Sequence, residues 1–174
     1  MVVAAGALQT PPLLRRSGLG GHPRTGRNLS VHPAISVAGR FSRPVTDGKG
    51  VLQSVGVEEL HADGILIEAT AAPPGMTSFV LPGVGQTLRR ELETTAHLAT
   101  LGAMVADRPR AGSWAASARS LRYDLAPRDA GRLLRAQRAM RRLLFAAGAE
   151  EVLTGVPHAP AREHPTNWRR CWTR

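Results

Sequence analysis

The chain has 174 residues, a formal charge of +10 at pH 7 and 43% hydrophobic residues. This length suits one domain, and the composition excludes wholesale disorder. Its apolar runs fall short of the roughly 20 residues that a membrane-spanning helix needs. One cysteine, Cys171, excludes an internal disulfide and a thiolate metal cluster. The start of the chain lacks the basic segment of a secretory signal, so we expect a cytoplasmic location.

The positive charge raises nucleic-acid binding as a hypothesis. Lys49 is the only lysine, and the arginines are spread along the chain and not gathered into one tract. Aromatic residues, which stack on the bases of single strands, make up only 4% of the chain. A small, basic, Arg-rich nucleic-acid-binding protein therefore remains the rival hypothesis and not the leading one.

The first residues predict a strand, a glycine turn and a helix. Residues 2–5 are apolar and stop at Gly6, as the end of a buried strand would. Thr10 suits an N-cap and Pro11 the first helical position, while the glycines within 18–21 end the helix. A strand that runs into a helix N-terminus can receive an anion or a dinucleotide, although many strand–turn–helix units share this form.

The rest of the chain predicts short strands and two longer helices. Strands are expected at 34–41, 51–57 and 65–71, a loop at 72–86, a helix at 86–106, a hairpin at 113–124 and a last strand at 151–153. An amphipathic helix is expected over 127–149, with Gly148 near its C-terminus and apolar positions at Leu133, Ala136, Met140, Leu144 and Ala147. Short strands covered by helices predict an α+β fold with a mostly antiparallel sheet.

The segment from Gly6 to Gly20, GALQTPPLLRRSGLG, resembles the second signature of the glucose-methanol-choline (GMC) family of FAD-dependent oxidoreductases. That signature has a small pair, Thr/Ser-Pro, two aliphatic residues and Ser-Gly-aliphatic-Gly. Residues 26–33, GRNLSVHP, resemble the family's Gly-x-Asn-Leu-x-x-His segment. Residues 38–41, 121–129 and 145–153 look like the bacterial branch related to long-chain alcohol oxidases, and the resemblance extends over roughly 1–157.

The resemblance implies a fragment of an FAD-dependent alcohol oxidoreductase, in which a hydride passes from an alcohol carbon to the flavin. Residues 1–30 would be a remnant of the FAD-binding domain, 31–156 a substrate-binding-type domain and 157–174 an irregular tail. The substrate of the parent enzyme would be a small-molecule alcohol. The residues that would contact the cofactor FAD are Ala5, Gly6, Ala7, Thr10, Asn28 and His32.

Two parts of a GMC enzyme have no counterpart in the sequence: the Gly-rich phosphate-binding motif and the segment with the catalytic histidine. His158 and His164 lie in the tail and are not expected to replace that base. We therefore expect no catalytic residue in this chain, and no activity of the chain alone. No histidine pair has metal-ligand spacing, so no metal site is expected. The alternatives are one subunit of a split enzyme and a non-catalytic binding module that kept the fold.

Overall fold

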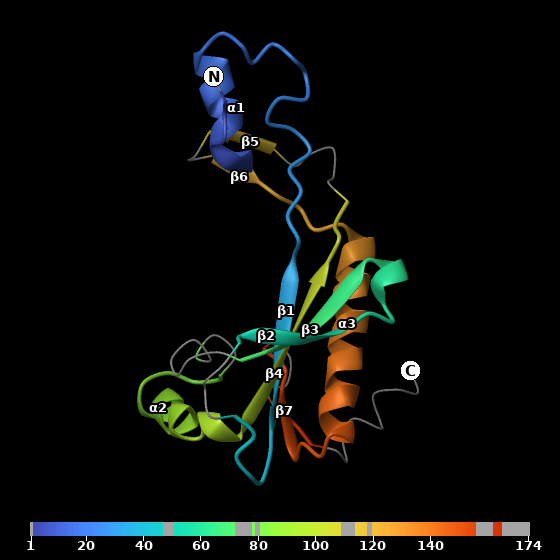
Figure 1. The fold of residues 1–174 in the computed structure, drawn as a ribbon. Coiled ribbons are helices and arrows are strands. Elements are labelled where there is room, and N and C mark those ends of the chain that lie inside the picture. Colours follow the sequence, from blue (N-terminus) through green and yellow to red (C-terminus); the bar gives the residue numbers. More distant parts are fainter. Residues whose placement is uncertain are drawn as a thin grey trace. The chain divides into compact units, whose positions relative to one another are not determined.

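The computed structural model describes residues 2–46, 51–71, 78, 81–108, 114–117, 120–155 and 162–164. The chain divides into two compact units, each built from segments that are distant in the sequence (Figure 1). The smaller unit comprises Met1–Pro33 and Ala106–Gly131, and the larger comprises Ala34–Val105 and Arg132–Arg174. The predicted tail lies outside the described residues except for 162–164, and so does the predicted loop at 72–86 over most of its length.

The larger unit contains a six-stranded sheet with the order β2-β3-β4-β1-β7-β8, in which all neighbours are antiparallel (Figure 1). The longest pairing, between β1 and β4, runs from Ala34 opposite Met104 to Arg40 opposite Leu98. The predicted α+β fold with an antiparallel sheet is confirmed. The strands are β1 (Ala34–Arg40), β2 (Gln53–Val57), β3 (Ile65–Thr70), β4 (Leu98–Val105), β7 (Glu151–Leu153) and β8 (Arg162–Glu163).

Helices α3 (Pro127–Ala146) and α2 (Gln86–Glu93) cover opposite faces of this sheet. Val37 of β1 belongs to the main apolar cluster, to which α3 contributes Ala136, Met140 and Leu144. The next residue, Ala38, belongs to the second cluster, against which the leucines of α2 pack. Successive side chains of a strand point to opposite faces, so β1 contributes to both cores. Burial of one such Val, Leu or Met side chain contributes about 1.5–3 kcal/mol.

The smaller unit contains helix α1 (Gly6–Arg16) and a two-stranded antiparallel hairpin of β5 (Trp114–Ser117) and β6 (Ser120–Arg122). Helix α1 lies next to β5, about a hundred residues later in the chain (Figure 1). The hairpin expected at 113–124 is thus confirmed over its described strands. Within the described part of the chain, no helix has the length and apolar content needed to cross a membrane.

Two expectations for the amino-terminal end are wrong. Residues 2–5 form no strand and are exposed, because no described strand pairs with them. Helix α1 begins at Gly6 with Ala5 as its N-cap, so Thr10 and Pro11 lie inside the helix. Proline is favoured at the first helical position, and inside a helix it removes the hydrogen bond that its missing N–H would donate, so α1 gives up two such bonds at Pro11 and Pro12. The helix therefore extends to the amino-terminal side of both prolines.

The helix expected over 86–106 is also wrong in its second half. Helix α2 ends at Glu93, a single 3₁₀ turn covers Thr95–His97, and β4 then occupies the centre of the sheet. Leucines at 92, 98 and 101 fit a helical period, but the residues of β4, from Leu98 onward, pair with both β1 and β3. Hydrogen bonding to two neighbouring strands outweighs a weak local helical preference.

Candidate functional site

The amino-terminal end of α1 is open and lined by small residues. Ala5, Gly6 and Ala7 are exposed, and a Cβ added to Gly6 would have no described atom within 4 Å. Ala5 has no side-chain oxygen to cap the helix, and the first turn contains no acidic residue. The N–H groups of a first turn carry partial positive charge and attract anions. A negatively charged or flat group can therefore approach the backbone at this end.

The other end of α1 explains the glycines of the signature. The Gly18 N–H donates to the Arg15 carbonyl at 3.2 Å, and the Leu19 N–H donates to the Leu14 carbonyl at 2.9 Å. This is a Schellman C-cap, which requires the left-handed backbone that Gly18 adopts with a φ of 71°. A Cβ at Gly20 would lie 2.8 Å from the Arg15 Cα, so that glycine permits the chain to pass close to the helix. The Ser-Gly-Leu-Gly segment thus terminates α1 with a C-cap and lets the following chain pack close to the helix.

The 26–33 loop carries the other two predicted contacts. Asn28 has a φ of 57°, the one positive φ of a non-glycine residue among those described, and asparagine tolerates this conformation better than most side chains. The side chains of Asn28 and His32 are exposed, whereas Leu29 between them is buried. The loop therefore buries Leu29 and exposes the polar side chains on either side of it.

Asp107 holds this loop through both carboxylate oxygens. Its Oδ1 accepts a hydrogen bond from the Ser30 hydroxyl at 2.7 Å. Its Oδ2 accepts from the Val31 N–H at 3.1 Å and from the Tyr123 hydroxyl at 2.7 Å. All four residues belong to the smaller unit. The segment after β4 and the segment after β6 therefore meet at the 26–33 loop.

The pKa values around Asp107 follow from these contacts. Burial opposes ionisation of Asp107, but the hydrogen bonds from Ser30, Tyr123 and Val31 outweigh it, so the pKa of Asp107 lies below its ordinary 3.8. Burial, the hydrogen bond to Asp107 and the negative charges of Asp107 and Asp129 raise the pKa of Tyr123 from 10.0 to about 12. At neutral pH the pair is an ionised carboxylate and a neutral phenol that donates to it.

Asp129 stabilises the start of α3 beside this cluster. It is buried, lies in the first turn of the helix, and accepts a hydrogen bond from the Arg108 N–H at 3.1 Å. A carboxylate in a first turn interacts favourably with the helix dipole. Asp129 therefore anchors the backbone one residue after Asp107 and supports its position.

The structure assigns all six predicted cofactor contacts to the smaller unit, including His32, which the sequence prediction placed in the 31–156 domain. Ala5, Gly6 and Ala7 lie at the start of α1, Thr10 lies within the helix and is half-buried, and Asn28 and His32 lie in the 26–33 loop. Within the part of the chain that the structure describes, no hydrogen bond or ion pair joins these six side chains to one another. Sequence reasoning missed Asp107, for which no motif gave a signal, and Tyr123, which lies in the segment 121–129 that resembles the long-chain alcohol oxidase branch.

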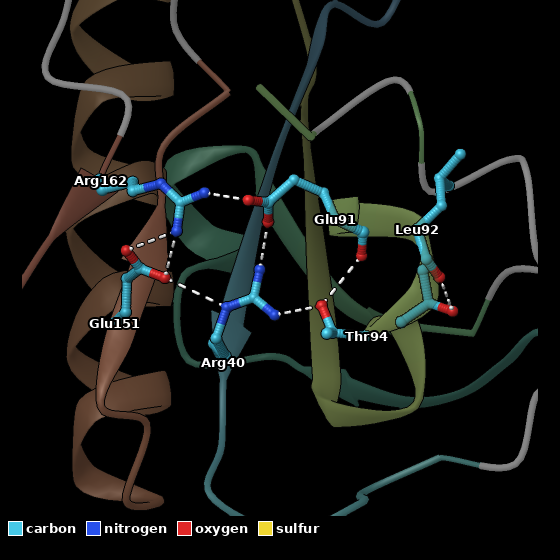
Figure 2. Close-up of polar contacts among 7 residues, drawn as sticks. Arg40, Glu91, Leu92, Thr94, Glu151 and Arg162 are labelled. Carbon is cyan, nitrogen blue, oxygen red and sulfur yellow. Dashed lines mark hydrogen bonds and ion pairs between the residues drawn. The ribbon is translucent and has the colours of Figure 1, made fainter. Parts of the chain in front are cut away.

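A second polar cluster lies in the larger unit and has a different character. Arg40 of β1 contacts Glu91 of α2 at 2.5 Å and Glu151 of β7 at 3.1 Å, and Arg162 of β8 pairs with the same two glutamates (Figure 2). The two positive and two negative charges balance, and both carboxylates pair with arginines of the sheet, Arg40 and Arg162. We therefore regard this cluster as a scaffold. The side chain of Glu91 is largely buried in this cluster.

Comparison with known proteins gives a family for these features. Residues 1–34 match the family model described as GMC oxidoreductase. The chain is 56% identical over 162 residues to an uncharacterized GMC-type oxidoreductase of Mycobacterium tuberculosis (strain CDC 1551 / Oshkosh), a match that covers 92% of this chain and 26% of that protein. It is 32% identical over 178 residues to a long-chain-alcohol oxidase of Arabidopsis thaliana, which covers 92% of this chain and 23% of the plant protein.

The matched segment of the family model contains both α1, whose start is exposed, and the 26–33 loop, which exposes Asn28 and His32. The chain spans about a quarter of the length of the curated relatives that it matches, 26% in the first case. The resemblance read from the signature at Gly6 to Gly20 is thus confirmed by independent comparison. By these matches the chain is similar to GMC oxidoreductases, and it corresponds to part of its relatives' length.

Proposed function

We propose that this chain supplies one wall of the flavin site and most of the substrate-side domain of an FAD-dependent alcohol oxidoreductase. The observation that carries the proposal is the coincidence of the family match at 1–34 with an open helix start of small residues. The antiparallel sheet of the larger unit, covered by helices, supports a substrate-side scaffold. The cytoplasmic location expected from the sequence stays a prediction.

The residues at the start of α1 fit a cofactor wall on steric grounds. The open space at Gly6 and the short side chains of Ala5 and Ala7 leave the backbone accessible to a flat group. Thr10, Asn28 and His32 would supply polar contacts to FAD. When bound, FAD supplies hydride acceptance from an alcohol carbon. The part of this chain is to present an unobstructed backbone and to fix the 26–33 loop, because the described residues include no predicted base for the alcohol proton.

The proposed substrate class is a long-chain alcohol. One support is the Arabidopsis relative at 32% identity, which is a long-chain-alcohol oxidase. The other is the resemblance of residues 38–41, 121–129 and 145–153 to the branch related to such oxidases. We propose that the isolated chain is inactive, since its relatives are about four times longer. Nucleic-acid binding receives no support from the comparisons, which are all with oxidoreductases.

A segment exchange tests this function. The segment of the Mycobacterium tuberculosis relative that aligns with this chain is replaced by the corresponding residues of this chain, and the purified protein is examined for flavin absorbance and for oxidation of primary alcohols of graded length. We expect the exchanged protein to retain as much flavin as the unmodified relative and to prefer long chains. A folded exchanged protein without flavin, beside a flavin-containing parent, contradicts the proposal.

The isolated chain provides a second measurement. Titration with FAD, followed by flavin fluorescence, is expected to show no tight binding and no alcohol oxidation. Tight binding or turnover by the 174-residue chain would show that the wall and the base reside in it, contrary to the proposal.

A further inference from the structure

The 26–33 loop needs an external anchor to hold its conformation. Asn28 is in the left-handed region, the flanking Gly26 also has a positive φ, and Leu29 is the buried side chain of this stretch. A non-glycine residue at positive φ costs about 1 kcal/mol or more, so the loop relaxes unless other contacts hold it. The question is which group supplies those contacts.

We infer that Asp107 is a positioning residue that fixes the 26–33 loop and thereby the side chains of Asn28 and His32. The importance of this role for a flavin site rests on the proposed function. The contacts fall on two consecutive residues, Ser30 and Val31, which lie between the two predicted cofactor contacts. Holding both residues at one carboxylate fixes the path of the backbone from Asn28 to His32.

The ionised form of Asp107 is needed for this geometry. Three donors converge on the carboxylate, namely one hydroxyl, one backbone N–H and one phenol. A carboxylate has about four lone-pair sites for them, whereas the amide of an asparagine has one acceptor oxygen and adds two donors. An Asp107→Asn variant keeps the size of the side chain but cannot accept all three bonds. Hydrogen bonds to charged groups are roughly twice as strong as neutral ones.

Tyr123 provides a spectroscopic probe of its hydrogen bond to Asp107. It is the only tyrosine of the chain, so the absorbance of phenolate near 295 nm reports on this one hydroxyl. The charged groups that face it are Asp107, which accepts its hydrogen bond, and Asp129. We expect its pKa to be about 12 in the wild type and lower in Asp107→Asn, where burial and the charge of Asp129 still hold it above 10.0.

Asp124→Asn is the matched control. Asp124 lies in the same unit, next to Tyr123 in sequence, but it is partly exposed and pairs with Arg122 at 3.1 Å. Its replacement removes the same charge at the surface and is expected to leave the Tyr123 pKa unchanged. A Tyr123 pKa that stays near 12 in Asp107→Asn overturns the inference.

Amide hydrogen exchange tests the positioning role itself. In Asp107→Asn, the Val31 amide and its neighbours within 28–32 are expected to exchange about tenfold faster or more, as loss of a charged hydrogen bond implies. Amides of β1 and β4 serve as internal references and are expected to exchange as in the wild type. Equal acceleration throughout the chain would show a loss of global stability and overturn a positioning role.

If the Asp107→Asn variant does not fold, Ser30→Ala tests the same role. Ser30 is exposed and loses only its bond to Oδ1, so faster exchange confined to Val31 and its neighbours is expected. An unchanged rate at Val31 in this variant overturns the inference.

Flavin retention separates this inference from the proposed function. In the exchanged relative, Asp107→Asn is expected to weaken flavin retention by about tenfold, and Asp124→Asn is expected to leave it unchanged. If the Asp107→Asn protein keeps its flavin as well as its parent, the positioning role at the cofactor is wrong. If neither the parent nor the variant holds flavin, the proposed function is wrong, while the Tyr123 and Val31 measurements still decide the anchoring of the loop.

Discussion

Gly39 of β1 lies directly against Leu144 of α3. A Cβ built at Gly39 would be 2.9 Å from the Leu144 Cδ2, which is closer than real Cβ contacts occur, and 3.1 Å from the Ala149 Cβ, which is tighter than most of them. The glycine in AGRF, one of the segments that resembles the long-chain alcohol oxidase branch, therefore permits the close approach of helix and sheet. The neighbouring Arg40 can then reach the polar cluster at the same end of β1 (Figure 2).

Gly39→Ala is expected to destabilise the larger unit. The added methyl has to displace Leu144 or Ala149 in a packed core, and overpacking of this kind costs about 1–3 kcal/mol. Urea unfolding of the purified chain measures the difference in the free energy of unfolding. Gly131→Ala is the control, because a Cβ there meets nothing within 4 Å and alanine raises helix propensity. It is expected to be neutral or stabilising by up to about 1 kcal/mol, and a Gly39→Ala protein of wild-type stability contradicts the packing.

Arg40→Gln is expected to cost about 2 kcal/mol. The variant leaves the buried Glu151 and the largely buried Glu91 with one positive partner between them, Arg162. Arg89→Gln is the matched control, since Arg89 forms an exposed i, i+4 pair with Glu93 and its loss is expected to cost under about 0.5 kcal/mol. Equal losses for both variants, measured by urea unfolding, would show that the Arg40 cluster adds no more than a surface pair.

Several elements could be predicted because their signal is local. The spacing of Ala136, Met140 and Leu144 predicts α3, and the structure buries these three residues against the sheet. Alternation in residues 65–70 likewise predicts β3, whose Ile65 and Ile67 are fully buried. In both cases the residues that face the core are those that define the period, so local pattern and tertiary packing agree.

The remainder depends on partners that a local pattern does not contain. Residues 98–105 satisfy a helical spacing, and pairing with β1 and β3 on both sides decides for a strand. Asp107 meets Ser30 across 77 positions of the sequence, and no motif links the two. The small residues around Gly6 could be read from the signature, but the helix start at Gly6 could not, since the sequence predicted it at Pro11. The group that holds the neighbouring loop likewise required the three-dimensional contacts.

The pH dependence of stability is expected to reveal the Asp107–Tyr123 pair at both ends of the scale. The folded pKa of Asp107 lies below 3.8, so its contribution is present above pH 3.8 and is lost as the pH falls through the folded value. The folded pKa of Tyr123 is raised to about 12, so its contribution is present below pH 10.0 and is lost as the pH rises toward 12.

The measurement is the difference in unfolding free energy between the wild type and Tyr123→Phe as a function of pH. Phenylalanine keeps the ring and removes only the titrating hydroxyl. We expect a constant difference of about 1 kcal/mol between pH 6 and 9 that shrinks above pH 10.0. A difference that does not change with pH up to 12 would show that the phenol does not titrate as part of the pair.

Gly18→Ala is expected to loosen the end of α1 without a steric clash. A Cβ there meets no described atom within 4 Å, so its effect comes from the backbone alone, whose φ of 71° costs a non-glycine residue about 1–2 kcal/mol. The Leu19 N–H, which donates to the Leu14 carbonyl, is expected to exchange faster as the Schellman C-cap opens. Gly21→Ala is the control, because that glycine has no positive φ and equally open surroundings. Equal exchange at Leu19 in the wild type and in Gly18→Ala would mean that the signature glycine is not required by the cap, and that its place in the signature has another cause.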